Sequence, residues 1–283
     1  MRGELLLKLS ALLALTMCAF AANSILNRIG VGRYGMDPMD FAATRVAAGA
    51  LTLWLLVALR GRFRPHVWSG HRVAGALALS GYMIGFSLAY LTLDAGLGAL
   101  ILFGVLQVVI FGWAVLKGQT IPPMRWLGAV VAFVGLCVLV WPGAQPVPVG
   151  GAIAMTIAGI SWAIYTLLGR GEPDALAATA TNFLLCLPLV LIVLPLSDSG
   201  TPSLPGLATA LLAGAATSGL GYALWYRILP HLPATLAGVA QLSVPVLTVI
   251  AGALILSEPL TMRLMLAAML VIGGIGISLY ARH

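Results

Sequence analysis

The residues most able to do chemistry in this sequence are polar side chains far inside long apolar segments. Arg45 is the one fully charged side chain well inside such a segment. Placing an arginine at that depth costs about 2.5–3.5 kcal/mol on insertion scales, so the group needs water or a partner. Its planar guanidinium suits bidentate binding of a carboxylate or phosphate, which predicts recognition of an anionic group on a substrate. The alternative is a structural role, either reaching towards the membrane surface or pairing with Asp40 or Asp94.

Neutral polar side chains lie at comparable depth in other apolar segments. They are Asn23, Asn27, Gln107, Asn182, Gln241 and Ser243. Each offers a donor or an acceptor at the depth where a transporter binds its substrate. Each could equally hydrogen-bond to a neighbouring helix, which is worth about 0.6–2 kcal/mol in a membrane.

Aromatic residues at helical spacing add a second set of candidates. Trp162 and Tyr165 are three residues apart, and Tyr222 precedes Trp225 and Tyr226 by three and four, so each set shares one helix face. Rings close to the membrane surface are typical of the interfacial belt, whereas deeper rings can form the wall of a pocket. The predicted substrate-binding residues are Asn23, Arg45, Tyr82, Gln107, Trp162, Tyr165, Asn182, Tyr222, Gln241 and Ser243.

Pro245 and the carboxylates bear on the transport mechanism. Pro245 lacks a backbone donor, so we expect it either to act as a hinge in its helix or to be a tolerated kink. All eight carboxylates fall in loops or near helix ends, whereas a proton-driven pump usually has one on the transport path. This pattern favours facilitated transport or exchange, with proton coupling through Asp94 or Glu258 as the alternative.

Enzyme and metal chemistry have weak support in the sequence. Ser87 lies in a Gly-Phe-Ser-Leu segment that resembles a nucleophile turn, but such a serine needs a base within about 3 Å. His231 is expected at the inner membrane surface, far from Ser87. The three cysteines show no C-x-x-C spacing, and the four histidines have no second ligand at metal spacing. We expect no enzymatic activity, no metal and no cofactor.

Membrane-spanning helices must position these side chains. Of 283 residues, 61% are hydrophobic and 8% are charged, compared with about 25% charged in a soluble domain, which excludes a water-soluble fold. Apolar runs of about 20 residues are long enough to cross a bilayer as helices. The runs are 9–29, 38–59, 73–93, 96–116, 124–141, 149–169, 176–196, 204–228, 231–256 and 262–280. The sequence therefore predicts an all-α integral membrane protein with ten transmembrane helices.

Basic residues are distributed unevenly between the expected loops. If both termini lie inside, eleven Lys and Arg residues fall on the inner side and three on the outer side, as the positive-inside rule expects. Topology thus explains the +7 net charge, and no nucleic-acid partner is expected. The predicted location is the plasma (inner) membrane, with both termini cytoplasmic. The first segment could alternatively be a cleavable secretory signal. Its apolar stretch continues past the small residues to Ile29, which favours a retained helix.

The two halves of the sequence share weak matches in the same order. Ala42-Ala43-Thr44 corresponds to Ala177-Ala178-Thr179. Gly85 and Tyr90 correspond to Gly221 and Tyr226, and Leu127 and Gly135 correspond to Leu266 and Gly274. An odd number of helices in each unit means that the second copy enters the membrane from the opposite side, and such inverted halves favour alternating access. We expect one five-helix repeat in residues 1–145 and an inverted repeat in residues 146–283.

Several motifs resemble one transporter family. They are Gly221-Tyr222-Ala223-Leu224-Trp225-Tyr226, Gln241-Leu242-Ser243-Val244-Pro245-Val246, Ser257-Glu258-Pro259-Leu260, Phe41-Ala42-Ala43-Thr44-Arg45 and Ser161-Trp162-Ala163. Over nearly its whole length the chain resembles the ten-helix EamA group of the drug/metabolite transporter superfamily. The resemblance implies a central cavity lined by both halves, with the fifth and tenth helices at the periphery. It also implies export or exchange of amino acids and related metabolites. The sequence departs from the family at Gly118-Gln119, where a glutamate would close the fourth helix.

Other functions and partners remain open. A lipid flippase or a membrane scaffold could share the helix count, but a lipid carrier should open a groove sideways to the bilayer. The expected partners are a small-molecule substrate and membrane lipids. Small residues in the fifth and tenth helices allow close packing, either within the chain or in a homodimer. They are Gly128, Ala132, Gly135, Gly274 and Ser278.

Overall fold

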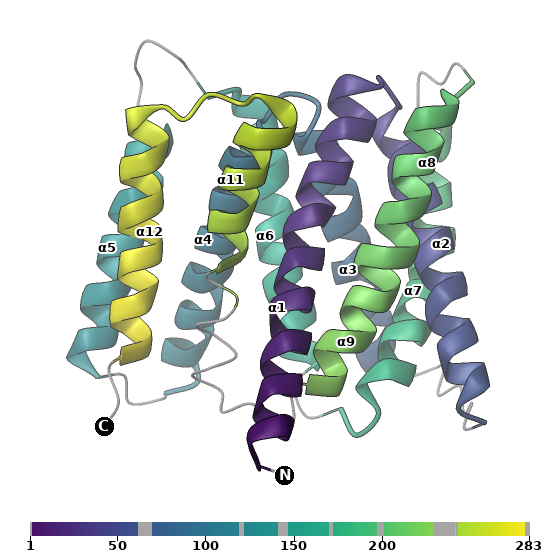
Figure 1. Cartoon of the computed structure of the whole chain (residues 1–283), viewed down its shortest axis with the longest axis horizontal. Helices are drawn as coiled ribbons and strands as arrows, with labels where there is room; N and C mark the ends of the chain where they lie inside the picture. The colour runs from purple at the N-terminus through teal and green to yellow at the C-terminus, as the bar shows by residue number, and fades with distance from the viewer. Residues whose placement is uncertain are drawn as a thin grey trace.

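The protein is represented by a computed structural model that describes the chain in eight stretches. They are residues 2–61, 70–118, 122–140, 147–169, 172–196, 201–228, 241 and 243–280. Every regular element within these stretches is a helix. The helices run side by side as one bundle (Figure 1).

Seven of the helical segments are long and apolar enough to cross a membrane. They comprise α1 (Arg2–Asn27) continued by the π-helix η1 (Arg28–Arg33), α2 (Pro38–Leu59), α3 (Gly70–Ala89), α4 (Ala95–Leu116), α6 (Val149–Gly169), α7 (Ala175–Val193), and a segment made of α8 (Leu204–Leu212), η3 (Ala213–Leu220) and α9 (Gly221–Ile228). The chain is therefore a multi-pass membrane protein. The helices α5 (Pro123–Val140), α11 (Ser243–Leu256) and α12 (Met262–Tyr280), together with the 3-10 turn η2 (Leu194–Leu196), complete the described elements.

Local sequence signals explain where several helices begin and end. Asp37 caps α2 by accepting a hydrogen bond from the backbone N–H of Met39 at 2.7 Å, and Pro38 occupies the first turn, where its missing donor costs nothing. Gly61 and Gly118 follow the C-termini of α2 and α4 with positive φ angles of 62° and 67°, a conformation that glycine adopts without steric penalty. Most observed ends lie within a few residues of those predicted from hydropathy, but α1 begins at Arg2 rather than at residue 9. Of the predicted run 231–256, the structure describes α11 from Ser243 onwards, and most of the run before it lies outside the described residues.

Two of the spans contain a π-helical turn that hydropathy did not predict. In η3 the backbone approaches α2 so closely that a Cβ on Gly214 would overlap the carbonyl oxygen of Arg45 and the methyl group of Ala48. The absence of a side chain at Gly214 therefore allows η3 to lie directly against the part of α2 that carries Arg45. This contact positions the candidate site.

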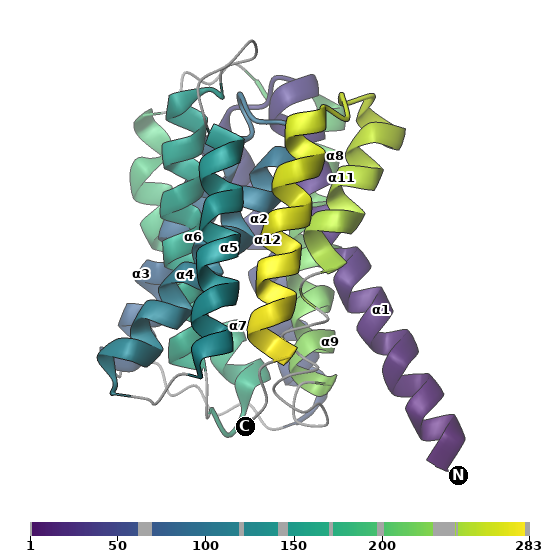
Figure 2. The ribbon, with the colours of Figure 1, turned by 90° about the vertical axis from the view of Figure 1, so that its left-hand side faces the viewer.

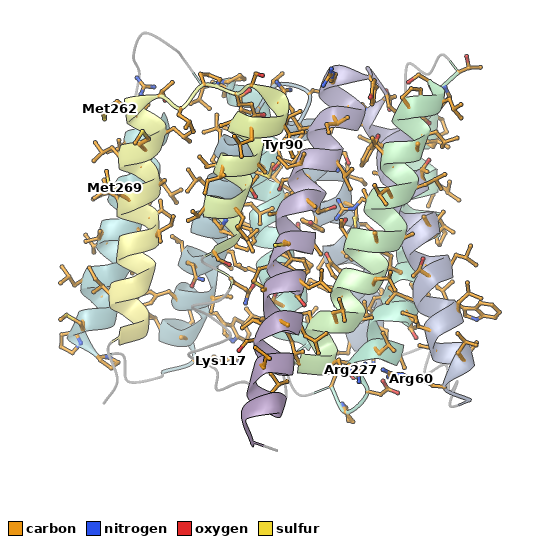
Figure 3. The ribbon with its side chains drawn as sticks, in the orientation of Figure 1. Arg60, Tyr90, Lys117, Arg227, Met262 and Met269 are labelled. Atoms are coloured by element: carbon orange, nitrogen blue, oxygen red, sulfur yellow. The ribbon has the colours of Figure 1, made fainter. Side chains whose placement is uncertain are left out.

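Helices from the two halves of the chain alternate in the bundle. The helix α3 packs against α6 and α7, α2 packs against α7 and η3, and α1 packs against α9, η3 and α11. The helix α4 contacts α6 and α11, while α5 and α12 pair with each other at one edge (Figures 1 and 2). Met262 and Met269 on α12 are 77% and 62% exposed and point away from the bundle (Figure 3), as expected for side chains that face lipid.

Several basic side chains gather at one end of the bundle. Arg60, Lys117 and Arg227 lie at one end, which we call the basic end, whereas Tyr90 lies towards the opposite end (Figure 3). The first turn of α1 and the last turn of α12 are both at the basic end (Figures 1 and 2). The opposite end contains the connection between α11 and α12.

Candidate substrate-binding site

Arg45 lies inside the bundle, where α2 meets η3 and α3. Its side chain is completely buried. The Nε atom donates to the hydroxyl of Ser218 at 3.0 Å, and Nη2 donates to the hydroxyl of Tyr82 at 3.2 Å. The remaining terminal nitrogen, Nη1, is buried without a hydrogen-bond partner. A buried charged donor without an acceptor is costly, so this atom needs an additional partner.

The neighbours of Arg45 supply hydroxyl groups and rings. The guanidinium carbon lies 5.3 Å from the ring centroid of Tyr82 and 5.2 Å from that of Phe86, within the range of a cation–π attraction. None of the ion pairs among the described residues includes Arg45, and Asp94 pairs with Arg28 instead. The interpretation of Arg45 as the partner of Asp40 or Asp94 is therefore wrong, because these carboxylates lie near the helix ends and Arg45 turns into the bundle.

A hydrogen-bonded chain joins Arg45 to α1. The Nδ2 of Asn23 donates to the Tyr82 hydroxyl at 3.2 Å, and the Thr217 hydroxyl donates to the Oδ1 of Asn23 at 3.1 Å. Tyr82 thus accepts from both Arg45 and Asn23, while neighbouring residues of η3, Thr217 and Ser218, bond to both ends of the chain. The sequence predicted Asn23, Arg45 and Tyr82 but not the two hydroxyl residues.

Trp162 connects this polar chain to a wall of aromatic rings. Its ring centroid lies 4.9 Å from Tyr82, 5.3 Å from Tyr222 and 5.6 Å from Tyr165, and the last pair is stacked. Tyr222 also contacts Phe183. Four of the predicted residues, Tyr82, Trp162, Tyr165 and Tyr222, therefore form one network of ring contacts, which reaches Arg45 through Tyr82. We refer to Asn23, Arg45, Tyr82, Trp162, Tyr165, Tyr222, Thr217 and Ser218 as the central cluster.

The other predicted residues are more scattered. Asn182 is buried on α7 with an unpartnered Oδ1, and it lines a narrow crevice together with Tyr165. Gln107 is half-buried on α4 and forms none of the described hydrogen bonds. Gln241 is half-buried beside residues outside the description, and Ser243 is the first residue of α11.

Pro245 is the third residue of α11. In the first turn of a helix the backbone N–H has no intrahelical acceptor, so the proline removes no hydrogen bond there. Its role as a hinge stays a prediction. Pro188, which the sequence analysis did not consider, lies inside α7.

Charged groups join the helices at each end of the bundle. At the basic end, Arg72 Nη2 donates to Glu172 at 2.7 Å, and the Nε2 of His71 lies 3.7 Å from the same carboxylate. At the opposite end, Arg28 lies between Asp94, at 3.3 Å, and Glu258, at 3.8 Å. Burial raises the pKa of Glu258 above its ordinary value, although the backbone N–H of Ala95 opposes this shift.

Comparisons with known proteins agree with this architecture. A family model described as the EamA-like transporter family matches residues 149–280. The chain is 46% identical over 273 residues to an uncharacterized protein of Pseudomonas aeruginosa, covering 96% of this chain and 94% of that protein. It is also 27% identical over 290 residues to an uncharacterized transporter of Archaeoglobus fulgidus, covering 98% and 99% of the two chains. One crystal structure of a protein 20% identical in sequence has the same fold, with a TM-score of 0.65 over 94% of this chain and 98% of that one.

Proposed function

Because the chain belongs to the EamA-like transporter family, we propose that it carries small polar metabolites with an anionic group across the membrane by alternating access. Amino acids and related compounds are the substrate class, moved by export or exchange. The observation that carries this proposal is the buried Nη1 of Arg45, a charged donor with no acceptor at the centre of the bundle. A substrate carboxylate would supply that acceptor, and guanidinium geometry favours such a pair.

The central cluster can also bind the rest of such a substrate. Asn23, Thr217 and Ser218 offer neutral donors and acceptors, and the rings of Trp162 and Tyr222 provide apolar walls. Sites of this composition, a mostly apolar surface with a few directed polar groups, are typical for small molecules. In the proposal Gln107, Asn182, Gln241 and Ser243 contact substrate in another conformation, when the helices around the cluster have separated.

For this mechanism we propose an architecture of ten spans in two inverted repeats, residues 1–145 and 146–283, since such repeats favour alternating access. The packing supports this arrangement, because it repeats when each helix is exchanged for its equivalent in the other half. The contact of α3 with α6 in one arrangement corresponds to the contact of η3 and α9 with α1 in the other. In the same way, the contact of α4 with α6 corresponds to that of α11 with α1. The pairs α2 with α7, α4 with α11 and α5 with α12 join equivalent helices.

The basic end is proposed to face the cytoplasm of a cell with the protein in its plasma (inner) membrane, so that both termini are cytoplasmic. The arginines and lysine at that end support this orientation through the positive-inside rule. A cysteine at the exposed Arg60 should react with an impermeant thiol reagent only in inside-out vesicles. Labelling of this cysteine in intact cells would show that the basic end faces outwards and that the proposed orientation is wrong.

A lipid flippase is the main alternative. Lipid headgroups would need a polar groove open to the bilayer, whereas the central cluster is enclosed by helices and Arg45 is completely buried.

A nucleophilic enzyme at Ser87 is disfavoured, since its hydroxyl is buried and accepts a hydrogen bond from Asn27 at 3.4 Å, with no base in that contact. A homodimer through the small residues of α5 and α12 is not needed, because these helices pack against each other.

Transport by the purified full-length chain in liposomes tests the proposal. Counterflow should be measured with a panel of labelled amino acids, other carboxylates, nucleosides and fluorescent lipids. We expect saturable exchange of at least one carboxylate-bearing compound and no lipid movement. Lipid movement without metabolite exchange would favour the flippase.

A further inference from the structure

The carboxylate of Glu258 caps a helix in the other half of the chain. Its Oε1 accepts a hydrogen bond from the backbone N–H of Ala95 at 2.7 Å, and Oε2 accepts from Gly96 at 3.4 Å. These are the first two residues of α4, whose N–H groups lack intrahelical acceptors. A carboxylate at this position also interacts favourably with the helix dipole. The loop between α11 and α12 is thus attached to the start of α4.

Asp94 would normally provide this cap. It stands at the N-cap position of α4, yet its side chain forms no capping hydrogen bond. It pairs instead with Nη2 of Arg28 at 3.3 Å. Arg28 in turn lies 3.8 Å from Glu258 and donates from Nη1 to the carbonyl oxygen of Tyr90 at 3.0 Å. One arginine from the junction of α1 and η1 therefore ties together the loop after α3, the start of α4 and the loop after α11.

This group of three charged residues lies between solvent and a column of buried rings. On one side is a cavity of about 370 Å³ lined by Asp94, Gly96, Glu258 and Arg263, among others. On the other side, the rings of Tyr82 and Phe86 in α3 and of Tyr90 directly after it follow at four-residue spacing, with neighbouring ring centroids 5.2 and 4.8 Å apart. The column ends at Arg45, whose guanidinium contacts Tyr82 and Phe86.

The loop that carries Glu258 has a restrained backbone. Ser257, directly after the end of α11, has a φ of 57°, the left-handed conformation in which many helices end. The N–H of Glu258 bonds to the carbonyl oxygen of Gly252 at 3.1 Å. This turn directs the carboxylate towards α4.

We propose that Arg28, Asp94 and Glu258 form a gate that closes the substrate path at the end opposite the basic end. Breaking it separates α1, α4 and the loop after α11, and exposes the aromatic column down to the central cluster. The proposal rests on the proposed transport function, because a gate has meaning only for a carrier. The gate proposal goes beyond the proposed function by naming the residues that control access to the central cluster from one side of the membrane. No member of the gate belongs to the central cluster.

Accessibility of Ser87 tests the gate without requiring transport. Ser87 is completely buried, one turn before Tyr90 on α3. In a chain with its three native cysteines replaced, Ser87→Cys should react slowly with a charged thiol reagent in detergent. Adding Glu258→Gln or Arg28→Gln should increase the rate at least tenfold. The control is Glu172→Gln, which removes the matching carboxylate from the ion pair at the basic end and should change the rate less than twofold. Equal rates in all variants, or an equal increase in the control, would overturn the gate.

A cross-link provides a second measurement if a gate variant is unstable. A Cβ on Gly96 would lie 3.1 Å from the Cα and 3.4 Å from the Cβ of Val249, so the start of α4 and the middle of α11 are in direct contact there. The double variant Gly96→Cys with Val249→Cys should cross-link under an added oxidant after a small local shift, and the cross-link should abolish transport until a reductant is added. Full transport by the cross-linked protein would contradict the gate. If the unmodified protein transports nothing while the Ser87→Cys rates follow the expectation, the proposed transport function is wrong. The inference that Arg28, Asp94 and Glu258 close this end of the bundle would still hold.

Discussion

Arg45 of α2 and Ser218 of η3 are joined by a hydrogen bond of 3.0 Å, although 173 residues separate them in the chain. The bond connects the two halves at the most deeply buried charge of the described structure. It fixes the guanidinium through Nε and leaves the terminal nitrogens to act on other groups. One of these contacts Tyr82, and the other has no partner. This geometry holds the side chain in place and leaves one buried charged donor without a partner, the donor that we propose binds the substrate.

Lysine should not replace Arg45. A lysine keeps the charge, but a single ammonium does not reproduce the planar fork that reaches Ser218, Tyr82 and a substrate together. We expect Arg45→Lys to fold nearly normally and to raise KM for a carboxylate substrate about tenfold or more, equivalent to one charge-assisted hydrogen bond of about 1.5–3 kcal/mol. Arg45→Gln should remove the preference for carboxylates before it reduces expression. Thermal unfolding in detergent, measured beside transport, checks both variants, and losses of stability and transport that run in parallel would make Arg45 a structural brace.

The hydroxyl of Tyr82 is predicted to stabilise the central cluster. Tyr82→Phe keeps the ring contact with Trp162 but leaves the donors of Arg45 and Asn23 without their shared acceptor. An unsatisfied buried donor costs about 1–3 kcal/mol, so the melting temperature should fall. Tyr34→Phe, in an exposed loop residue, is the matched control and should change stability by less than about 0.5 kcal/mol. Equal melting temperatures for both variants would show that the hydroxyl is replaceable by water.

The sequence predicted those parts of the site that are expensive to bury. Arg45 and Asn23 were recognisable because an uncompensated charge or amide is rare inside an apolar segment. Thr217 and Ser218 were not, because a buried hydroxyl is readily satisfied by its own helix. Thr217 also bonds to the carbonyl oxygen of Ala213 at 2.7 Å, a local bond that makes such residues common in membrane helices.

Contacts between segments distant in the chain could not be predicted from the sequence. Phe86 and Phe183 look like ordinary lipid-facing residues, and only the packing of the helices brings them to the rings of the site. The π-helical turn of η3 leaves no signature in hydropathy. Glu258 was expected near one membrane surface, but its hydrogen bonds to Ala95 and Gly96 depend on the folded loop. Helix positions followed from chain length and apolarity, which are local properties.

Gly214 is predicted to be essential for the close approach of η3 to α2. In Gly214→Ala the new methyl group would overlap the backbone of Arg45 and the side chain of Ala48, and such overpacking costs about 1–3 kcal/mol. Gly112→Ala is the control, because a Cβ at Gly112 in α4 meets nothing within 4 Å, and it should stabilise the helix by up to about 1 kcal/mol. Thermal unfolding in one detergent compares the two variants. A stable Gly214→Ala protein would mean that η3 can move away from α2.

Glu258 should make stability depend on pH in a defined direction. Burial, followed by the nearby charge of Asp94, raises its pKa above the ordinary value of 4.5, against the opposing effects of the Ala95 and Gly96 N–H groups and of Arg28. The folded protein therefore binds this proton more tightly than the unfolded chain does. The associated stability is fully present below the ordinary pKa and is lost as the pH rises through the pKa of the folded state. Glu258→Gln cannot titrate, so the melting temperature of the unmodified protein should fall relative to this variant between about pH 4 and the folded pKa. The difference between the two proteins cancels the other titrating groups, and a difference that stays constant or grows in the opposite direction would contradict a pKa of Glu258 that burial raises.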